Sequence, residues 1–187
     1  MEIPADLEQK IDEVITHYPV SKRSAVLPLL HLLQEHFGYI SKETADWVAA
    51  KLDLQPINVL EVVTFYPMFR AAAPGRHHIR VCRTLSCAMG GSYQLMNDLC
   101  ALAKIERPKH AGHGTPFTVG EDGKFSIEFV ECLASCGTAP VCMVNDDFYE
   151  GVTKEAAEQI LAKYGDAPAA KVPVQYDDTP TVPSTLY

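Results

Sequence analysis

Two short stretches decide the fold of this chain: VCRTLSC at residues 81–87 and ECLASCGTAP at residues 131–140. They contain four of the six cysteines, spaced as C-x4-C, then 44 intervening residues, then C-x3-C. Two close pairs far apart in sequence suit a four-thiolate metal site, because each pair can bind from one loop while the fold brings the loops together. The pattern predicts an iron–sulfur site with four cysteine ligands, namely Cys82, Cys87, Cys132 and Cys136.

The composition of the 187 residues limits the kinds of protein this can be. The chain is long enough for one core plus a small helical appendage. Its apolar runs are broken by Pro28, His31 and Glu61 and are shorter than the ~20 residues that a bilayer requires, so we expect no membrane insertion. The start, MEIPAD, lacks the pattern of a secretory signal, so we expect a cytoplasmic protein.

A reducing compartment and a chain of this size favour metal or redox use of the cysteines over three disulfides. The net charge of −8 offers no phosphate-binding surface, so nucleic acid is not an expected partner.

Apolar periodicity predicts four helices in the N-terminal part. They are expected at residues 5–17, 21–38 with Pro28 at a bend or in the first turn, 41–53, and 56–65. Short helices with short connections predict a helical bundle over residues 1–70. The aromatic run TFYPMF at 64–69 is expected at the junction with the next domain, and residues 70–76 read as a linker.

The C-terminal part mixes strand and helix patterns. Strands are expected at 77–82, 117–119, 125–130, 141–144 and 148–150, with helices at about 92–105 and 153–165 and a turn at 87–91. The first strand would deliver Cys82 and the third Cys132. We therefore predict an α+β protein with a bundle at 1–70, a second domain at 77–165, and an extended or disordered tail at 166–187.

Several of these residues also resemble a known family. The C-x4-C and E-C-L-x-x-C motifs, Ala139-Pro140, N-D-D-x-Y at 145–149 and TFYPMF at 64–69 resemble the small ferredoxin subunit of NADH-quinone oxidoreductase, the respiratory complex I. The resemblance runs from about Pro19 to Tyr164.

The resemblance implies a thioredoxin-like domain that carries one 2Fe-2S cluster on Cys82, Cys87, Cys132 and Cys136. It implies an electron-transfer subunit of an NADH:quinone oxidoreductase, docked on a flavoprotein subunit that holds the FMN and the NADH site. It also implies further complex I partners in the peripheral arm, at the cytoplasmic face of a membrane-bound complex in a bacterium. Where the family commonly has glycine, this chain has Ala134.

The residues around the cysteines suggest how a cluster would be surrounded. Backbone N–H groups of residues 84–90 and the hydroxyls of Thr84 and Ser86 are expected to point toward the sulfurs. The apolar side chains near the cysteines are expected to shield the cluster from water; these are Leu85, Met89, Leu133 and Ala139. Arg83 fits either a cation that acts on the cluster or a solvated surface charge.

Three alternatives remain open on sequence alone. The cysteine spacing also fits a structural zinc site in an interaction module. A thiol–disulfide oxidoreductase is disfavoured because there is no C-x-x-C pair at a strand-to-helix turn. The same kind of subunit serves NAD-linked hydrogenases and formate dehydrogenases.

Two cysteines and the glycine pattern complete the sequence interpretation. Cys100 is expected in the core, whereas Cys142 is a minor candidate for a substitute ligand. No dinucleotide-binding glycine motif occurs, so hydride transfer is expected on a partner.

Overall fold

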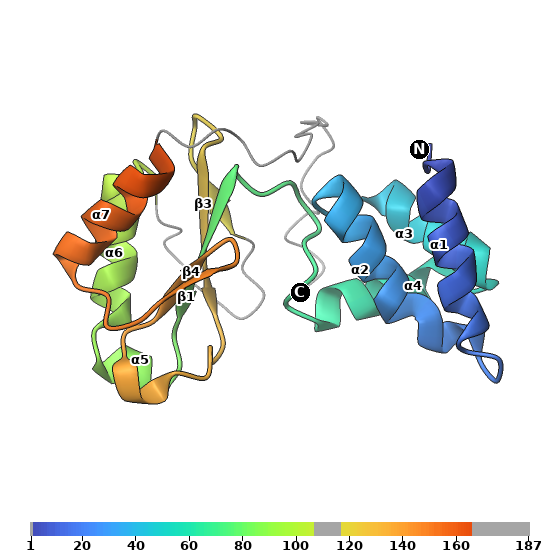
Figure 1. Ribbon diagram of the computed structural model, residues 1–187, viewed down its shortest axis with the longest axis horizontal. Coiled ribbons are helices and arrows are strands. Elements are labelled where there is room, and N and C mark those ends of the chain that lie inside the picture. The colour runs from blue at the N-terminus through green and yellow to red at the C-terminus, as the bar shows by residue number, and fades with distance from the viewer. Residues whose placement is uncertain (1, 107–116, 166–187) are drawn as a thin grey trace.

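A computed structural model describes residues 2–106 and 117–165. The N-terminal part, which we call the helical region, confirms the four predicted helices (Figure 1). Pro28 lies in the first turn of the second helix, where a missing N–H costs no helical hydrogen bond, and a short 3-10 turn precedes it. The elements are α1 (Ala5–Thr16), η1 (Lys22–Ala25), α2 (Val26–Phe37), α3 (Lys42–Leu52) and α4 (Pro56–Phe65).

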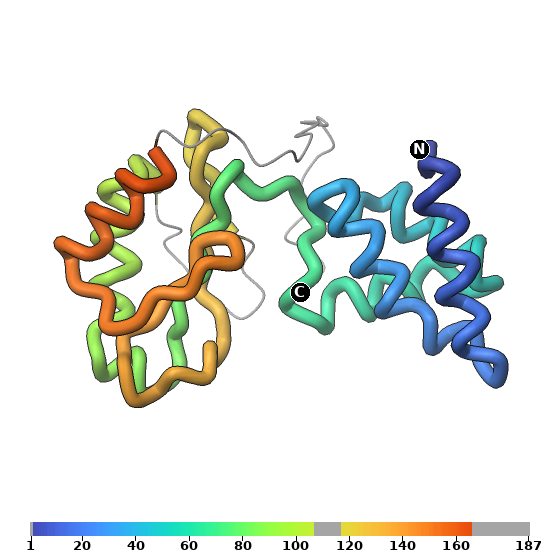
Figure 2. Tube along the Cα trace, viewed as in Figure 1, coloured from blue at the N-terminus to red at the C-terminus, as the bar shows by residue number. Residues whose placement is uncertain are grey.

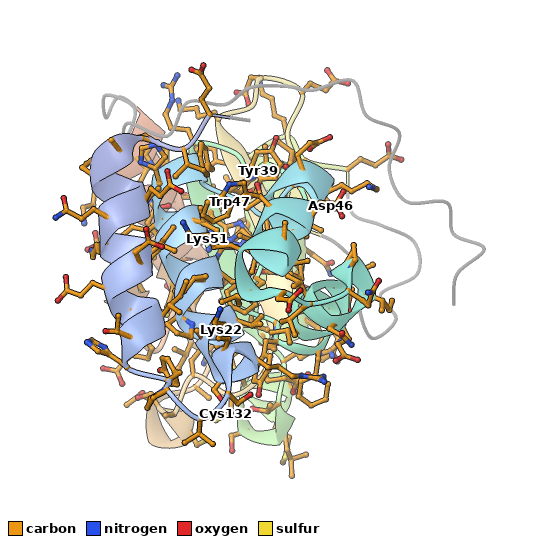
Figure 3. The ribbon with its side chains drawn as sticks, turned by 90° about the vertical axis from the view of Figure 1, so that its right-hand side faces the viewer. Lys22, Tyr39, Asp46, Trp47, Lys51 and Cys132 are labelled. Carbon is orange, nitrogen blue, oxygen red and sulfur yellow. The ribbon has the colours of Figure 1, made fainter. Side chains whose placement is uncertain are left out.

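The helical region has its own buried core. Side chains from all four helices are fully buried in it, among them Ile11, Leu29, Leu33, Val48 and Val59. The Ser41 hydroxyl caps α3 by accepting the Thr44 N–H at 3.2 Å. Lys51 on α3 donates to Glu8 and Asp12 of α1, both at 2.9 Å, and lies over the Trp47 ring (Figure 3).

The C-terminal part, which we call the sheet region, contains five strands in the order β2-β3-β1-β4-β5. Within residues 2–106 and 117–165, the β1–β3 pair is parallel and the other strand pairs are antiparallel. The chain passes from one region to the other once over the described residues, as the colours in Figure 2 show. The strands are β1 (His77–Cys82), β2 (Thr118–Val119), β3 (Phe125–Val130), β4 (Cys142–Val144) and β5 (Asp147–Tyr149).

Three helices and one 3-10 turn complete this region: α5 (Leu85–Met89), α6 (Ser92–Leu102), η2 (Cys136–Thr138) and α7 (Lys154–Gly165). The predicted strands and the two longer helices are confirmed. The turn predicted at 87–91 is wrong in part, because the chain first closes a short helix from residue 85. Its backbone bonds run from the Ala88 N–H to the Thr84 carbonyl and from the Gly90 N–H to the Ser86 carbonyl, both at 2.8 Å.

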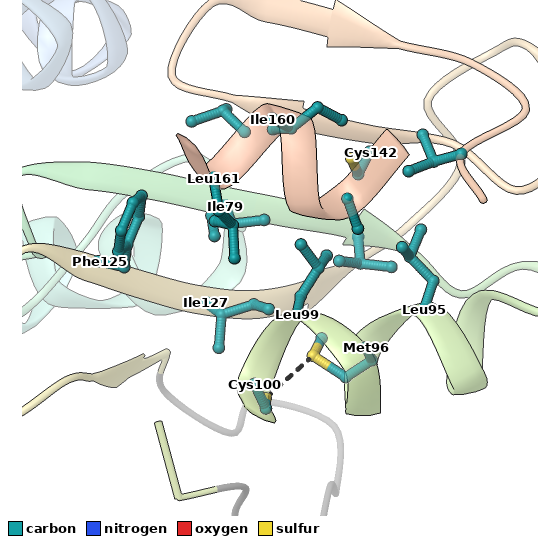
Figure 4. Close-up of a cluster of buried hydrophobic side chains, with 14 of the residues drawn as sticks. Ile79, Leu95, Met96, Leu99, Cys100, Phe125, Ile127, Cys142, Ile160 and Leu161 are labelled. Carbon is teal, nitrogen blue, oxygen red and sulfur yellow. Dashed lines mark hydrogen bonds between the residues drawn. The ribbon is translucent and has the colours of Figure 1, made fainter. Parts of the chain in front are cut away.

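One face of the sheet packs against α6 and α7 (Figures 1 and 4). Alternate residues of β1, Ile79 and Val81, point into this core, as period-two patterning requires. The core also contains both remaining cysteines, so the expected place of Cys100 is confirmed, with its thiol 3.8 Å from the Met96 sulfur. Burial raises the pKa of Cys142 to about 12, which keeps its thiol protonated and argues against its use as a ligand.

Near the opposite ends of the strands from the cysteines, buried polar side chains join β1 to β3. The His78 ring lies 2.7 Å from the Ser126 hydroxyl and 2.7 Å from the Glu128 carboxylate. Gly75 precedes β1, and a Cβ there would lie 2.5 Å from the backbone of Phe125, so only glycine permits this approach.

Among the described residues, no helix combines the length and apolar character needed to cross a membrane. The domain limits 1–70, 77–165 and 166–187 stay a prediction, and residues 166–187 lie outside the described residues.

Candidate iron–sulfur site

The parallel register of β1 and β3 brings the two cysteine stretches together. Cys82, the last residue of β1, is paired with Val130, the last residue of β3. Beyond that pair, the Arg83 N–H still donates to the Val130 carbonyl at 3.0 Å. We call residues 82–91 the first cysteine loop and residues 131–140 the second cysteine loop. Both begin at the same edge of the sheet because the carboxyl ends of parallel strands share an edge.

An ion pair joins the two loops directly after the strands. Arg83 donates from Nη2 and Nε to one carboxylate oxygen of Glu131, at 2.8 and 3.2 Å. Each residue is adjacent to a cysteine, Cys82 and Cys132 respectively. Arg83 is therefore a partly exposed charge that is paired with Glu131, since its side chain is 21% exposed.

The first pair of sulfurs is buried. Cys82 and Cys87 are 1% and 2% exposed. Burial disfavours the thiolate of Cys82, yet hydrogen bonds from the Thr84 hydroxyl and from the backbone N–H groups of Leu133 and Thr84 lower the pKa of this thiol overall. The Thr84 hydroxyl lies 3.3 Å from the Cys82 sulfur, as expected.

The second pair of sulfurs is exposed, at the lower end of the sheet region where Figure 3 labels Cys132. The sulfurs of Cys132 and Cys136 lie 3.6 Å apart. The Ala134 N–H donates to the Cys132 sulfur at 3.3 Å. Ala134 has φ 65°, a left-handed conformation that glycine adopts without strain, which explains why a methyl group is unfavourable here.

Side chains from both loops contact each other. Leu133 and Ala139 of the second loop pack against Cys82 and Cys87, while their shielding of a cluster stays a prediction. A hydrogen bond from Ser86 and the nearby charge of Cys82 both act on the Cys136 thiol. Gly90 is required by this contact, because a Cβ there would lie 2.9 Å from the Ala139 Cβ.

One cysteine of each pair, Cys87 or Cys136, has a raised pKa. Burial and the neighbouring Cys82 raise the pKa of Cys87. The hydrogen bond between the Cys136 and Cys132 thiols and the charge repulsion between the two sulfurs raise the pKa of Cys136. One thiol of each pair thus favours its protonated form, and a bound metal ion would favour the thiolate form instead.

The spacing of the second pair fits metal ligation. A tetrahedral metal with metal–sulfur bonds of about 2.3 Å holds its sulfurs roughly 3.8 Å apart, close to the distance between Cys132 and Cys136. Within residues 2–106 and 117–165, no group of three or more His, Cys, Asp or Glu side chains lies in an arrangement that could hold a metal ion. The sulfurs are arranged as two pairs, and a binuclear cluster takes two ligands on each iron.

Two predictions about shielding are wrong. Leu85 and Met89 are 76% and 82% exposed, so neither shields the sulfurs from water. They lie on the outer side of α5, whereas Cys87 on the same short helix is buried. Apolar character alone does not show which side of a single helical turn faces the core.

Sequence reasoning missed three contributors to the site. The backbone N–H groups of Leu133 and Val141 act on Cys82 and Cys87 from outside the first loop. Glu131 was also missed. Glu131 lies directly after the end of β3 and next to a cysteine, as Arg83 does after β1, and this matching position was the signal that could have identified the pair.

Comparisons with known proteins agree with this geometry. The family model of the thioredoxin-like [2Fe-2S] ferredoxins matches residues 11–165. A Rickettsia felis protein, named as the E subunit of NADH-quinone oxidoreductase, is 37% identical over 155 residues, covering 82% of this chain and 87% of that one. The Aquifex aeolicus protein of the same name is 38% identical over 164 residues, covering 87% and 96%. The Thermus thermophilus protein, named as subunit 2 of that enzyme, is 36% identical over 159 residues, covering 84% and 83%.

A solved structure shares the fold. An NAD⁺-reducing [NiFe]-hydrogenase in the H2-reduced state matches with a TM-score of 0.60 at 18% identity, over 76% of this chain and 22% of that one. The family model spans most of the chain, and the named relatives match over more than four fifths of it. The chain therefore belongs to the thioredoxin-like [2Fe-2S] ferredoxin family, together with these small subunits of NADH-quinone oxidoreductase.

Proposed function

We propose that this chain is the electron-transfer subunit of the NADH dehydrogenase module of NADH-quinone oxidoreductase. It holds one 2Fe-2S cluster on Cys82, Cys87, Cys132 and Cys136. The observation that carries this proposal is the meeting of two cysteine pairs at one edge of the sheet, joined by the Arg83–Glu131 ion pair, in a member of this family.

Backbone groups of this chain can stabilise the negative charge that a cluster would gain on reduction. A bound cluster of this kind takes up and releases one electron. Backbone N–H groups of Thr84, Leu133 and Ala134 donate to the sulfurs of the two loops. Because these donors are held by the fold, they stabilise the added negative charge without having to move.

The two pairs differ in how open they are to a partner. Cys82 and Cys87 are buried, whereas Cys132 and Cys136 are exposed at the end of the sheet region. Each pair would hold one iron, and the exposed pair, Cys132 and Cys136, would hold its iron on the side that faces solvent. This edge is where a flavoprotein subunit, with the FMN and the NADH site, would exchange electrons. Further partners are peripheral-arm subunits of a complex at the cytoplasmic face of the membrane.

Metal analysis and spectroscopy test this proposal. Protein purified without oxygen is expected to contain two irons and two acid-labile sulfides per chain. Reduction with dithionite is expected to produce an electron paramagnetic resonance signal of one spin per cluster. One zinc and no sulfide would contradict the proposal and favour the structural zinc site instead.

A second candidate function is the equivalent diaphorase subunit of an NAD-linked hydrogenase or formate dehydrogenase. The fold shared with the NAD⁺-reducing hydrogenase favours it. Isolation of the native complex through a tag on this chain distinguishes the two. We expect NADH-dependent quinone reduction in the isolated complex, whereas hydrogen-dependent or formate-dependent NAD⁺ reduction would assign the chain to the second class.

A further inference from the structure

A carboxylate outside both cysteine loops holds the second one. Glu150 lies directly after β5, and its oxygen Oε1 accepts hydrogen bonds from the hydroxyls of Ser135 and Thr138, the latter at 2.6 Å. The two hydroxyl oxygens lie 2.7 Å apart, so both converge on the same carboxylate oxygen. Ser135 and Thr138 flank Cys136 on either side. The carboxylate thus fixes the loop at the point where it presents this sulfur.

The backbone after Glu150 extends the same contact. The Gly151 N–H donates to the Thr138 carbonyl at 2.7 Å, and the Val152 N–H donates to the Pro140 carbonyl at 3.0 Å. Residues 150–152 therefore run alongside residues 135–140 and hold them through side chain and backbone together. The bonds to the carboxylate lower the pKa of Glu150, so it is ionised at neutral pH.

The second loop needs such support more than the first. Cys132 and Cys136 are exposed, and the turn between them contains Ala134 in a left-handed conformation. Such a backbone conformation persists only when surrounding contacts hold it. The first loop obtains its support from a strand end and a buried helix residue, Cys82 and Cys87.

We propose that Glu150 is a positioning residue for the second pair of cluster ligands. Its carboxylate orients Ser135 and Thr138 and through them Cys136. It also places a fixed negative charge beside the exposed part of the site, which disfavours addition of an electron there. This inference rests on the proposed function, because it assumes that Cys132 and Cys136 bind iron.

Two substitutions at Glu150 separate geometry from charge. Glu150→Ala removes the acceptor, whereas Glu150→Gln keeps an oxygen that can accept both hydroxyls but removes the charge. Glu158, an exposed glutamate on α7, provides matched controls with the same changes of charge. The readouts are the rate at which an iron chelator bleaches the cluster and the midpoint potential from a titration followed by electron paramagnetic resonance.

We expect Glu150→Ala to lose iron at least roughly tenfold faster than wild type, because it removes two hydrogen bonds to a charged group and the loss of one such bond can have about this effect. Glu150→Gln is expected to lose iron at nearly the wild-type rate and to have a more positive midpoint potential, a shift that a purely structural role would not produce. Both Glu158 variants are expected to match wild type in both measurements.

A variant on the loop side covers the case in which Glu150→Ala does not fold. Thr138→Val keeps the shape of the side chain and removes one hydroxyl donor, so it is expected to speed iron loss as well. When Thr138→Val is combined with Glu150→Ala, the rate of iron loss should increase little further, because both substitutions remove the bond between Thr138 and Glu150.

The inference is overturned if Glu150→Ala loses iron no faster than Glu158→Ala, or if Glu150→Gln loses it as fast as Glu150→Ala. Failure of the proposed function would look different. It would appear as zinc without sulfide in the wild-type protein, before any variant is compared.

Discussion

The first and second cysteine loops each supply a pair of sulfurs, but their surroundings differ. The first pair comes from a strand end and a short helix, and both sulfurs are buried. The second pair is exposed and lies around a turn with a left-handed alanine and a short 3-10 segment. Backbone pairing and packing hold the first pair, whereas side-chain and backbone bonds from residues 150–152 hold the second.

The difference shows that one set of four ligands can combine a pair held by packing with a pair held by hydrogen bonds at the surface. A buried pair tolerates little change in volume around it, because interiors are close-packed. An exposed pair has less packing around it, so its position depends mainly on the backbone conformation of its loop and on the hydrogen bonds that hold that loop. Substitutions in the two loops should therefore differ in kind as well as in size.

The largest expected effect is loss of the cluster when any one ligand is removed. Cys87→Ser and Cys132→Ser, one from each loop, are both expected to abolish the signal of the reduced protein, because a 2Fe-2S cluster uses all four thiolates. Cys100→Ser, whose thiol lies in the core, should retain it. A normal signal from either loop variant would contradict the assignment of that pair.

The next effect concerns the contact between the loops. A Cβ on Gly90 would lie 2.9 Å from the Ala139 Cβ and 3.2 Å from the Ser86 carbonyl oxygen, so Gly90→Ala is expected to lower the free energy of unfolding by about 1–3 kcal/mol. Urea unfolding followed by circular dichroism measures this. Gly137→Ala is the control in the second loop, because a Cβ there meets nothing within 4 Å. Equal losses in the two variants would argue against a tight contact at Gly90.

Glycine substitutions should have opposite effects in the two loops. Ala134→Gly is expected to stabilise the second loop by about 1 kcal/mol, because a left-handed conformation costs an alanine roughly that much. Ala88→Gly, within helix α5 of the first loop, is expected to destabilise by about 1 kcal/mol. Urea unfolding and the rate of iron loss to a chelator provide the measurements. Destabilisation by Ala134→Gly would show that the second loop is not strained.

A smaller effect is expected from pH, through the strands that support both loops. Burial lowers the pKa of His78, and burial and nearby cations lower that of His77. The unfolded chain then binds protons from about pH 6.5 downward while the folded chain does not, so stability should fall as the pH drops through this range. Urea unfolding between pH 7.5 and 5.5 should show that the free energy of unfolding declines less steeply in His78→Gln than in wild type. An unchanged slope would contradict a role for His78.

The smallest effect is expected from the ion pair between the loops. Arg83→Gln removes the bond to Glu131, a carboxylate that is 60% exposed, so the loss of stability should not exceed about 1 kcal/mol. The difference from wild type should shrink in 1 M salt, which screens such pairs. A loss that is larger and independent of salt would indicate that the pair is more buried than its exposure implies.

Much of the site could be predicted because its ligands are cysteines with a distinct spacing. The strands that end at Cys82 and near Cys132 were predicted from alternating apolar residues. Short-range helix signals also placed α1 to α4; of the two alternatives predicted for Pro28, a bend or the first turn, the structure has the first turn. The side of α5 that faces solvent was not predictable, since Leu85, Met89 and Cys87 are all apolar within one and a half turns.

The sequence by itself determined the strands, the two cysteine pairs and every longer helix, though not the short helix α5, because these features depend on periodicity and spacing along the chain. Only the tertiary structure decided that β1 and β3 lie parallel and in register, that Arg83 meets Glu131, and that Glu150 holds the second loop. These contacts join residues that are distant in sequence. No local pattern records them, because their partners are chosen by packing of the whole sheet.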